Sequence, residues 1–354
     1  MYFCRQMTLH VFNPEHDLAL AANLSNFTAP HAGRQLRADL GYIPALWTTD
    51  DDVVLVENAE DAEWCYRQLV RRPFGRFVEK EQIARLPLTG VDVWGWDKAI
   101  RAFLLRQGVE ASLMPSDDRL AVVRELSHRR LASGLLSQLQ GEDLTGEAQM
   151  TDSMAELREH LERVGRMVVK APWSSSGRGV RFIEGSMSRY DEGWARNVIA
   201  RQGHLMLEPY YNKVKDFGME FESDGEGQVT SLGLSLFHTS NGAYTGNIMA
   251  TEEEKQEMLG HYIPCDLLDA VRQQIASMTG RLFKGKYKGL FGIDMMIVAK
   301  EDQAGFLLHP CVEVNLRRTM GHVALHLTPH IKGLPKVMQV TYDKSQYKLK
   351  VRPL

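Results

Sequence analysis

The stretch VVKAPWSSSGRGV, residues 168–180, decides how this sequence is interpreted. Two β-branched valines lead into Lys170, and a loop with three serines and two glycines follows after Ala-Pro-Trp. Small residues allow backbone N–H groups to approach an anion closely, and the lysine adds a positive charge beside them. The stretch therefore predicts a strand that ends at a phosphate-binding loop. A surface turn with a solvated lysine is the alternative. A P-loop is excluded, because here the lysine precedes the loop.

Oxygen-bearing side chains lie in two later segments, GIDMMIV and VEVNLRR. The first carries Asp294. The second carries Glu313 and Asn315, which point to the same face of a strand because they are two residues apart. If the two segments pair as neighbouring strands, Asp294 joins the other two. Two carboxylates and an amide oxygen suit Mg²⁺ that holds nucleotide phosphates. A hairpin with a solvated acidic face is the alternative. Arg317 and Arg318 follow, and either could neutralise a phosphoryl group or a substrate carboxylate.

The composition sets outer limits on the class of protein. The chain has 354 residues, 44% of them hydrophobic and 25% charged, which suits a globular protein of two or three lobes. Its formal net charge of −3 gives no general reason to expect a nucleic-acid or membrane partner. The cysteines are scattered without a C-x-x-C pair, so we expect free thiols and a cytoplasmic protein.

The secondary-structure pattern changes along the chain. Strands and helices alternate over residues 1–115, which indicates a small parallel α/β domain. Two helices capped by Ser116 and Ser127 follow, and then a polar loop over 140–152. The later half has the pattern of an antiparallel α+β unit. The predicted domains are residues 1–115, 116–204 and 205–354.

The order of these motifs along the chain is more specific than any one of them. Lys170 and its loop come first, Glu208 ends a strand in LMLEPY, and Asp294 and the E-x-N of Glu313 and Asn315 follow. This order resembles the ATP-grasp superfamily, which includes D-alanine–D-alanine ligase, glutathione synthetase and biotin carboxylase. VVKAPWSSSGRGV looks like the lysine strand and serine-rich lid loop of the D-alanine–D-alanine ligases. The resemblance covers about residues 116–330, and it implies a small parallel α/β domain followed by a two-lobed ATP-grasp fold.

The resemblance also implies a nucleotide-binding role for residues in the first lobe and at the hinge. Lys170 would contact the α- and β-phosphates, and Glu208 would lie near the adenine, with Glu220 or Glu222 on the ribose side. An earlier basic residue of the family, often lysine, is replaced by Arg129 or Arg130. The lid over the transferred phosphate would consist of Ser174, Ser175, Ser176 and Gly177.

The implied metal site and reaction depend on the second lobe. Asp294, Glu313 and Asn315 would hold Mg²⁺, and Arg317 would face the phosphoryl group. The expected enzyme is an ADP-forming ligase with ATP and Mg²⁺ as cofactors. It activates a carboxylate as an acylphosphate for attack by an amine or similar nucleophile. The partners would be small-molecule carboxylate and amine substrates, with a homodimer as a candidate assembly. The alternatives are a small-molecule kinase of the same fold and a nucleotide-binding module without turnover.

Two stretches outside these motifs are candidates for the acceptor side. NPEHDLALA follows the first predicted strand, where open α/β domains bind ligands, but plain helix capping by Asn13 explains it as well. HTSNGAYTGN, residues 238–247, is predicted as a polar loop, either over the active site or on the surface. Asp97 is predicted to cap the helix that follows it, and residues 111–115 to form a short strand.

Overall fold

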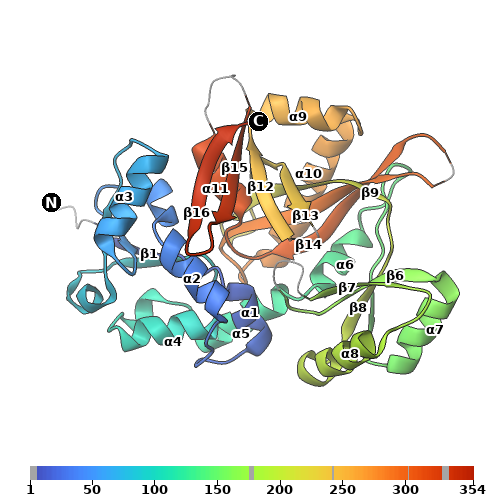
Figure 1. Ribbon diagram of the computed structural model, residues 1–354, viewed down its shortest axis with the longest axis horizontal. Coiled ribbons are helices and arrows are strands. Elements are labelled where there is room, and N and C mark those ends of the chain that lie inside the picture. The colour runs from blue at the N-terminus through green and yellow to red at the C-terminus, as the bar shows by residue number, and fades with distance from the viewer. Residues whose placement is uncertain (1–5, 175–178, 241–242, 302, 329–334) are drawn as a thin grey trace. The chain divides into compact units, whose positions relative to one another are not determined.

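The computed structural model describes residues 6–174, 179–240, 243–301, 303–328 and 335–354, which fold into two compact units (Figure 1). The first unit comprises Met1–Arg124, Thr245–Thr251 and Arg317–Leu354, and the second comprises Glu125–Tyr244 and Glu252–Leu316. The chain therefore returns twice to the first unit. The three domains predicted from the sequence stay a prediction, and the two units are described separately.

A parallel sheet with strand order β3-β2-β1-β4 forms the centre of the first unit. Its strands are β1 (Thr8–Val11), β2 (Val53–Leu55), β3 (Arg76–Val78) and β4 (Gly90–Val93). Side chains alternate between the two faces of a strand. Leu9 and Val11 pack into one core, whereas the side chain of His10 contacts Asp92. The small parallel α/β domain predicted from the sequence is confirmed.

Helices and a second sheet complete the first unit. The helices are α1 (His16–Ala22), α2 (His31–Leu40), η1 (Ile43–Leu46), α3 (Ala59–Leu69), η2 (Lys80–Arg85), α4 (Lys98–Arg106), η3 (Ala111–Leu113), α5 (Asp117–Leu126) and α11 (Met320–Leu327). Strands β12 (Ala243–Met249), β15 (Lys336–Tyr342) and β16 (Tyr347–Pro353) pair in an antiparallel sheet. Phe12, Val54 and Trp94 share a buried core with Val323 and Met338, so the C-terminal segment covers one face of the parallel sheet.

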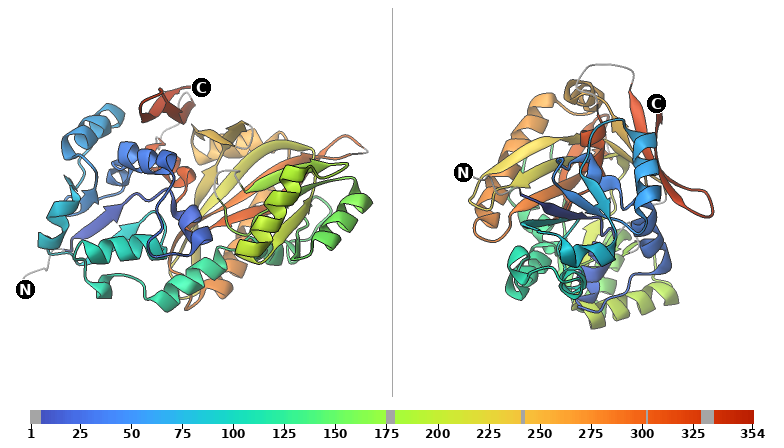
Figure 2. Two further views of the ribbon diagram at one scale, coloured as in Figure 1. Left: turned by 60° about the horizontal axis from the view of Figure 1, so that its bottom comes forward. Right: turned by 90° about the vertical axis from the view of Figure 1, so that its left-hand side faces the viewer.

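The second unit contains two antiparallel sheets. The first, in the order β5-β8-β6-β7, is formed by β5 (Gln149–Thr151), β6 (Arg166–Lys170), β7 (Val180–Glu184) and β8 (Leu205–Pro209). Helices α7 (Met154–Val164) and α8 (Arg189–Gln202) cover one of its faces, as Figure 2 shows. The helix side chains Leu157, Leu161, Ala195 and Val198 pack there against the strands. The other face of this sheet carries Lys170 and Glu208 beside the apolar Val168 and Met206.

The other sheet of the second unit has the order β10-β9-β13-β14. It is formed by β9 (Lys213–Ser223), β10 (Val229–Ser235), β13 (Gly289–Ala299) and β14 (Phe306–Asn315). The remaining elements are α6 (Arg130–Leu136), β11 (Phe237–Ser240), α9 (Glu252–Gly260) and α10 (Cys265–Phe283). Pro310 lies inside β14 at an interruption of the register with β13, as expected because proline has no N–H for the ladder.

Several local predictions were wrong. Asn13 does not cap α1: the N-cap residue is Glu15, and the Asn13 amide bonds to the carbonyl of Gly95 instead. Residues 111–113 form a 3-10 turn, because i→i+3 bonds close over a stretch without β-branched residues. Helix α6 begins at Arg130 rather than directly after Ser127.

Two predicted loops contain strands. The segment 140–152 includes the short strand β5, and the segment 238–247 belongs largely to β11 and β12. In the second case the sequence carries an Asn-Gly pair between residues of high strand propensity, which is a hairpin signal. Within the described residues, none of the helices combines the length and the hydropathy that a membrane span requires.

Candidate functional site

Lys170 and Glu208 form a buried ion pair at the end of β6. The Lys170 Nζ lies 2.5 Å from Glu208 Oε2, and the two side chains are 9% and 7% exposed. In the antiparallel register Val168 lies opposite Glu208 and Lys170 lies opposite Met206, so the pair is diagonal on one face of the sheet. Desolvation cancels much of what such a pair contributes to stability. The net contribution of this pair to folding is therefore small, although each charge depends on the other.

The two ends of the serine-rich loop lie against each other. The Ala171 N–H donates a hydrogen bond of 2.8 Å to the carbonyl of Gly179. A Cβ added to Gly179 would lie 2.2 Å from the Cβ of Ser174, so no other residue fits there without displacing the loop. Ser175, Ser176 and Gly177 lie outside the described residues, and the lid role given to them and to Ser174 stays a prediction.

Arg129, and not Arg130, points toward these groups. Its guanidinium donates to the carbonyl of Ala171 (2.5 Å), to Ser174 Oγ (2.7 Å) and to Glu313 Oε1 (2.8 Å), and its side chain is 5% exposed. Arg130 instead pairs with Glu125 at the surface. The sequence left this choice open. The structure connects the serine-rich loop to Glu313 through a single arginine.

The candidate metal residues meet on β13 and β14. Asp294 lies directly opposite Glu313 in the antiparallel register, as expected if the two segments pair. The Asn315 amide donates to Asp294 Oδ2 at 3.2 Å, which leaves its carbonyl oxygen as a potential ligand. Among the described residues no three His, Cys, Asp or Glu side chains form a metal site. A cation here would therefore depend on the Asn315 oxygen as well as on the two carboxylates, an all-oxygen set that fits Mg²⁺.

A buried thiol lies two residues before Glu313 on the same strand. Cys311, on β14, is fully buried. Burial raises the pKa of this thiol, and the charges of Asp294, Glu208 and Glu313 raise it further, while Lys170 lowers it. The nearby His309 is buried as well. Burial, with a contribution from the Lys170 charge, lowers the pKa of His309 to about 3, so this ring is neutral at neutral pH.

Two glutamates on β9 were candidates for the ribose side. Glu220 is 3% exposed and lies opposite Gly292 of β13. Glu222 is exposed. Burial favours Glu220 for a role inside the unit, although the ribose contact itself stays a prediction.

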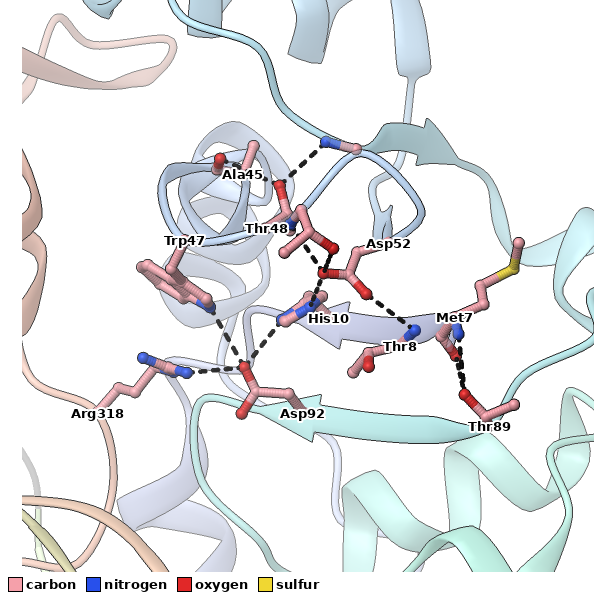
Figure 3. Close-up of polar contacts among 12 residues, drawn as sticks. Met7, Thr8, His10, Ala45, Trp47, Thr48, Asp52, Thr89, Asp92 and Arg318 are labelled. Atoms are coloured by element: carbon pink, nitrogen blue, oxygen red, sulfur yellow. Dashed lines mark hydrogen bonds and ion pairs between the residues drawn. The ribbon is translucent and has the colours of Figure 1, made fainter. Parts of the chain in front are cut away.

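Arg317 and Arg318 belong to the first unit, and each is held by a different aspartate there. Arg317 makes two bonds to the Asp17 carboxylate, at 2.8 and 2.7 Å. Arg318 donates to Asp92 at 2.9 Å, and its guanidinium lies 4.2 Å from the centre of the Trp47 ring (Figure 3). Sequence analysis named the stretch that contains Asp17 as a candidate for the acceptor side, but it missed Asp92. For Asp92 the signal was present, because it is a charged residue between two valines of a strand.

The stretch that begins at Asn13 is fixed at the carboxyl end of the parallel sheet. His16, 1% exposed, bonds to Asp97 at 3.0 Å, and Glu15 pairs with Arg37 at 3.0 Å. Asp97 also caps α4, as predicted. Because β1 and β4 are neighbours while the chain runs from β1 to β2, this edge is the topological switch point, where open α/β sheets bind ligands.

No protein-family model matches the sequence, and no curated protein matches it either. Solved structures are similar in fold. The N5-carboxyaminoimidazole synthetase of Staphylococcus aureus, complexed with ADP, gives a TM-score of 0.50 at 12% identity, over 98% of this chain and 84% of that one. The biotin carboxylase of Campylobacter jejuni, in a β-γ-ATP complex, gives a TM-score of 0.50 at 13% identity, over 95% of this chain and 75% of that one.

A third structure is the biotin carboxylase domain of the Hydrogenobacter thermophilus 2-oxoglutarate carboxylase, in complex with MgADP, ADP and bicarbonate. It gives a TM-score of 0.51 at 14% identity, over 95% of this chain and 74% of that one. Together these likenesses confirm the predicted fold: the chain has the ATP-grasp fold. Identity this low shows the fold alone, so the reaction is argued from the residues.

Proposed function

We propose that the protein is an ATP-dependent, ADP-forming ligase that joins a small carboxylic acid to an amine or similar nucleophile. One observation carries the proposal. Arg129 bonds at once to Ser174, at the start of the serine-rich loop, and to Glu313, the central candidate metal ligand. A single guanidinium therefore links the loop that would cover the phosphates to the strand that would hold their cation.

The nucleotide would be held by residues of the second unit. Lys170 and Arg129 provide positive charge for the phosphates, and Glu208 and Glu220 provide acceptors for the adenine and ribose sides. Since Lys170 is already paired with Glu208, nucleotide binding would exchange part of that ion pair for a phosphate contact.

The charge balance of this cluster favours a cation. Lys170 and Arg129 contribute two positive formal charges, whereas Glu208, Asp294 and Glu313 contribute three negative ones, which leaves −1. Asp294, Glu313 and Asn315 would hold Mg²⁺, which when bound supplies positive charge beside the transferring phosphoryl group.

The reaction would proceed in two displacements. A carboxylate oxygen attacks the γ-phosphorus, the bond to the β,γ-bridging oxygen breaks, and ADP leaves. The amine nitrogen then attacks the acyl carbon of the acylphosphate and loses a proton, and inorganic phosphate leaves with one oxygen of the original carboxylate. Lys170, Arg129 and Arg317 contribute by positioning and by neutralising charge on the transferred group.

Oxygen-18 in the carboxylate tests this scheme. Acids including amino acids and bicarbonate are labelled, supplied with Mg²⁺–ATP and a pool of amines, and the phosphate and nucleotides are analysed by mass spectrometry. The proposal predicts ADP and phosphate that carries one labelled oxygen, with loss of turnover in Lys170→Met. Unlabelled phosphate, AMP with pyrophosphate, or a stable phosphorylated product in place of free phosphate would each contradict it. The last outcome would indicate a kinase.

A further inference from the structure

Three carboxylates of the first unit form a network around the segment that follows the E-x-N motif. Asp17 holds Arg317. Figure 3 shows that Asp92 holds Arg318 and that Asp52 lies on the far side of His10. These groups come from residues 17, 52, 92 and 317–318, which are distant along the chain and are brought together by the parallel sheet.

Asp92 is the centre of this network. Its Oδ2 accepts hydrogen bonds from His10 Nδ1 (2.9 Å), Trp47 Nε1 (3.2 Å) and Arg318 Nη2 (2.9 Å). Burial tends to raise the pKa of Asp92, but the His10 hydrogen bond and the Arg318 charge outweigh it, so the pKa lies below its usual value. A carboxylate that stays charged in a partly buried position is a strong and fixed acceptor for Arg318.

His10 is held between two carboxylates. Its ring is 6% exposed, with Nδ1 on Asp92 and Nε2 3.5 Å from Asp52 Oδ2. Asp52 is fixed in turn, because it accepts from the Thr8 N–H (3.0 Å), the Thr49 N–H (2.8 Å) and the Thr49 hydroxyl (2.8 Å). The ring therefore cannot turn without breaking the contact with Asp92.

The network reaches Arg317 through the backbone. The Arg318 N–H donates to the carbonyl of Trp94 at 2.8 Å, directly after β4. Arg317 donates to the carbonyl of Arg318 at 3.0 Å and makes its two bonds to Asp17. Asp92 holds the Arg318 side chain and Trp94 holds its backbone, so loss of the Asp92 contact removes one of the two restraints on the residue whose carbonyl Arg317 uses. The orientation of the Arg317 guanidinium thus depends on both Asp17 and Asp92.

We propose that His10 and Asp92 are positioning residues for Arg317, acting through Arg318. This inference rests on the proposed function, in which Arg317 neutralises the transferred phosphoryl group. His10 touches no substrate and transfers no proton in this account. His10 keeps the Asp92 carboxylate in the position from which it binds Arg318. Arg318 in turn helps to orient Arg317.

The test is a double-mutant cycle with His10→Gln and Asp92→Asn, each assayed for ADP release with the acid and amine that support turnover. Since a misplacement of about 1 Å can cost about 100-fold in rate, we expect each single variant to lower kcat by about 10- to 100-fold. The KM for ATP should change less than about twofold, because the nucleotide residues lie in the second unit. If His10 acts through Asp92, the double variant should be no slower than Asp92→Asn alone.

A second readout does not depend on activity. In protein labelled with 5-fluorotryptophan, the ¹⁹F resonance of Trp47, assigned with Trp47→Phe, should shift in His10→Gln because the Arg318 guanidinium no longer stacks in place. The control Glu63→Gln changes an exposed pair with Arg67 on α3 and should leave kcat and the resonance unchanged. If His10→Gln does not fold, Trp47→Phe removes one donor to Asp92 and should lower kcat by about two- to fivefold.

Failure of this inference and failure of the proposed function give different results. Wild-type protein that turns over ATP while His10→Gln and Asp92→Asn keep the wild-type kcat overturns the inference alone. Additive losses in the double variant also overturn it, because the two residues then act separately. Wild-type protein without any Mg²⁺–ATP turnover overturns the proposed function on which the inference rests.

Discussion

The two units hold their charges in opposite ways. In the first unit, Asp52 and Asp92 each accept three hydrogen bonds from groups of the same unit, and the Arg318 guanidinium is one of the donors to Asp92. In the second unit, three carboxylates meet two cations, and the side chain of Glu313 remains 29% exposed. The carboxylates of the first unit thus have fixed donors from their own unit. In the second unit, Asp294 and Glu313 lie opposite each other with an amide oxygen nearby, an arrangement that favours a cationic ligand.

Breaking the buried pair of the second unit should have the largest effect. Lys170→Met leaves the Glu208 carboxylate buried without its partner, so the free energy of unfolding should fall by about 3–5 kcal/mol. The double variant Lys170→Met/Glu208→Leu should regain most of this stability in urea denaturation. Neither variant should be stabilised by Mg²⁺–ATP. A double variant that regains nucleotide stabilisation would show that the pair serves folding only.

In the first unit, Asp92→Asn should lower the free energy of unfolding by about 3 kcal/mol at pH 7, since three hydrogen bonds lose their charged acceptor. The pKa of Asp92 is depressed in the folded protein, so the stability that its charge contributes is present above the ordinary value of about 3.9. It is lost as the pH falls through the lower folded value. Urea denaturation at pH 7, 5 and 3.5 should show the difference from wild type shrinking only at the lowest pH. A difference that stays constant would mean that the carboxylate charge contributes nothing.

A smaller effect is expected at the switch point of the parallel sheet. A Cβ added to Gly95 would lie 2.5 Å from the ring of the buried His16, so Gly95→Ala should destabilise the first unit by about 2 kcal/mol. The ring can relieve the overlap only by leaving Asp97. Chemical denaturation measures the change in the free energy of unfolding. A variant as stable as wild type would show that His16 does not pack tightly against Gly95.

The smallest change should have the opposite sign. Gly193 lies inside α8 with no atom within 4 Å of an added Cβ, so Gly193→Ala should stabilise the second unit by about 0.5–1 kcal/mol through helix propensity alone. It serves as the matched control for Gly95→Ala in the same denaturation experiment. A destabilising result would indicate packing against this position.

The sequence predicted the candidate site of the second unit better than that of the first. Glu313 and Asn315 share a strand face by their spacing alone, and Asp294 meets them because a short turn joins the two strands. Spacing along the sequence does not show whether Arg129 or Arg130 points toward the serine-rich loop, because this depends on where α6 begins. The same limit explains β11 and β12, where Thr and Tyr form strands in a stretch that looks polar.

The pairs of Arg317 with Asp17 and of Arg318 with Asp92 could not be predicted at all. They join residues 300 and 226 positions apart, and they exist only because the chain returns to the parallel sheet after Asn315. Pairing over such distances depends on the tertiary fold and leaves no periodic signal in either segment. A charged residue inside an apolar strand, such as Asp92, indicates that it has a partner in the fold. The sequence does not identify that partner.

Thermal unfolding of wild type and Glu313→Gln tests the central claim most directly. Each protein is melted with EDTA, with Mg²⁺ and with Mg²⁺–ATP, and Glu226→Gln, an exposed position between β9 and β10 of the same unit, is the matched control. Glutamine keeps an acceptor for Arg129 but removes one charge from the candidate metal site. A ligand at 100 times its Kd stabilises by about 2.7 kcal/mol, so the account predicts a clear Mg²⁺–ATP shift in wild type and Glu226→Gln and the loss of most of it in Glu313→Gln. A Glu313→Gln protein with the full Mg²⁺–ATP shift would contradict the metal site, and with it the proposed ligase.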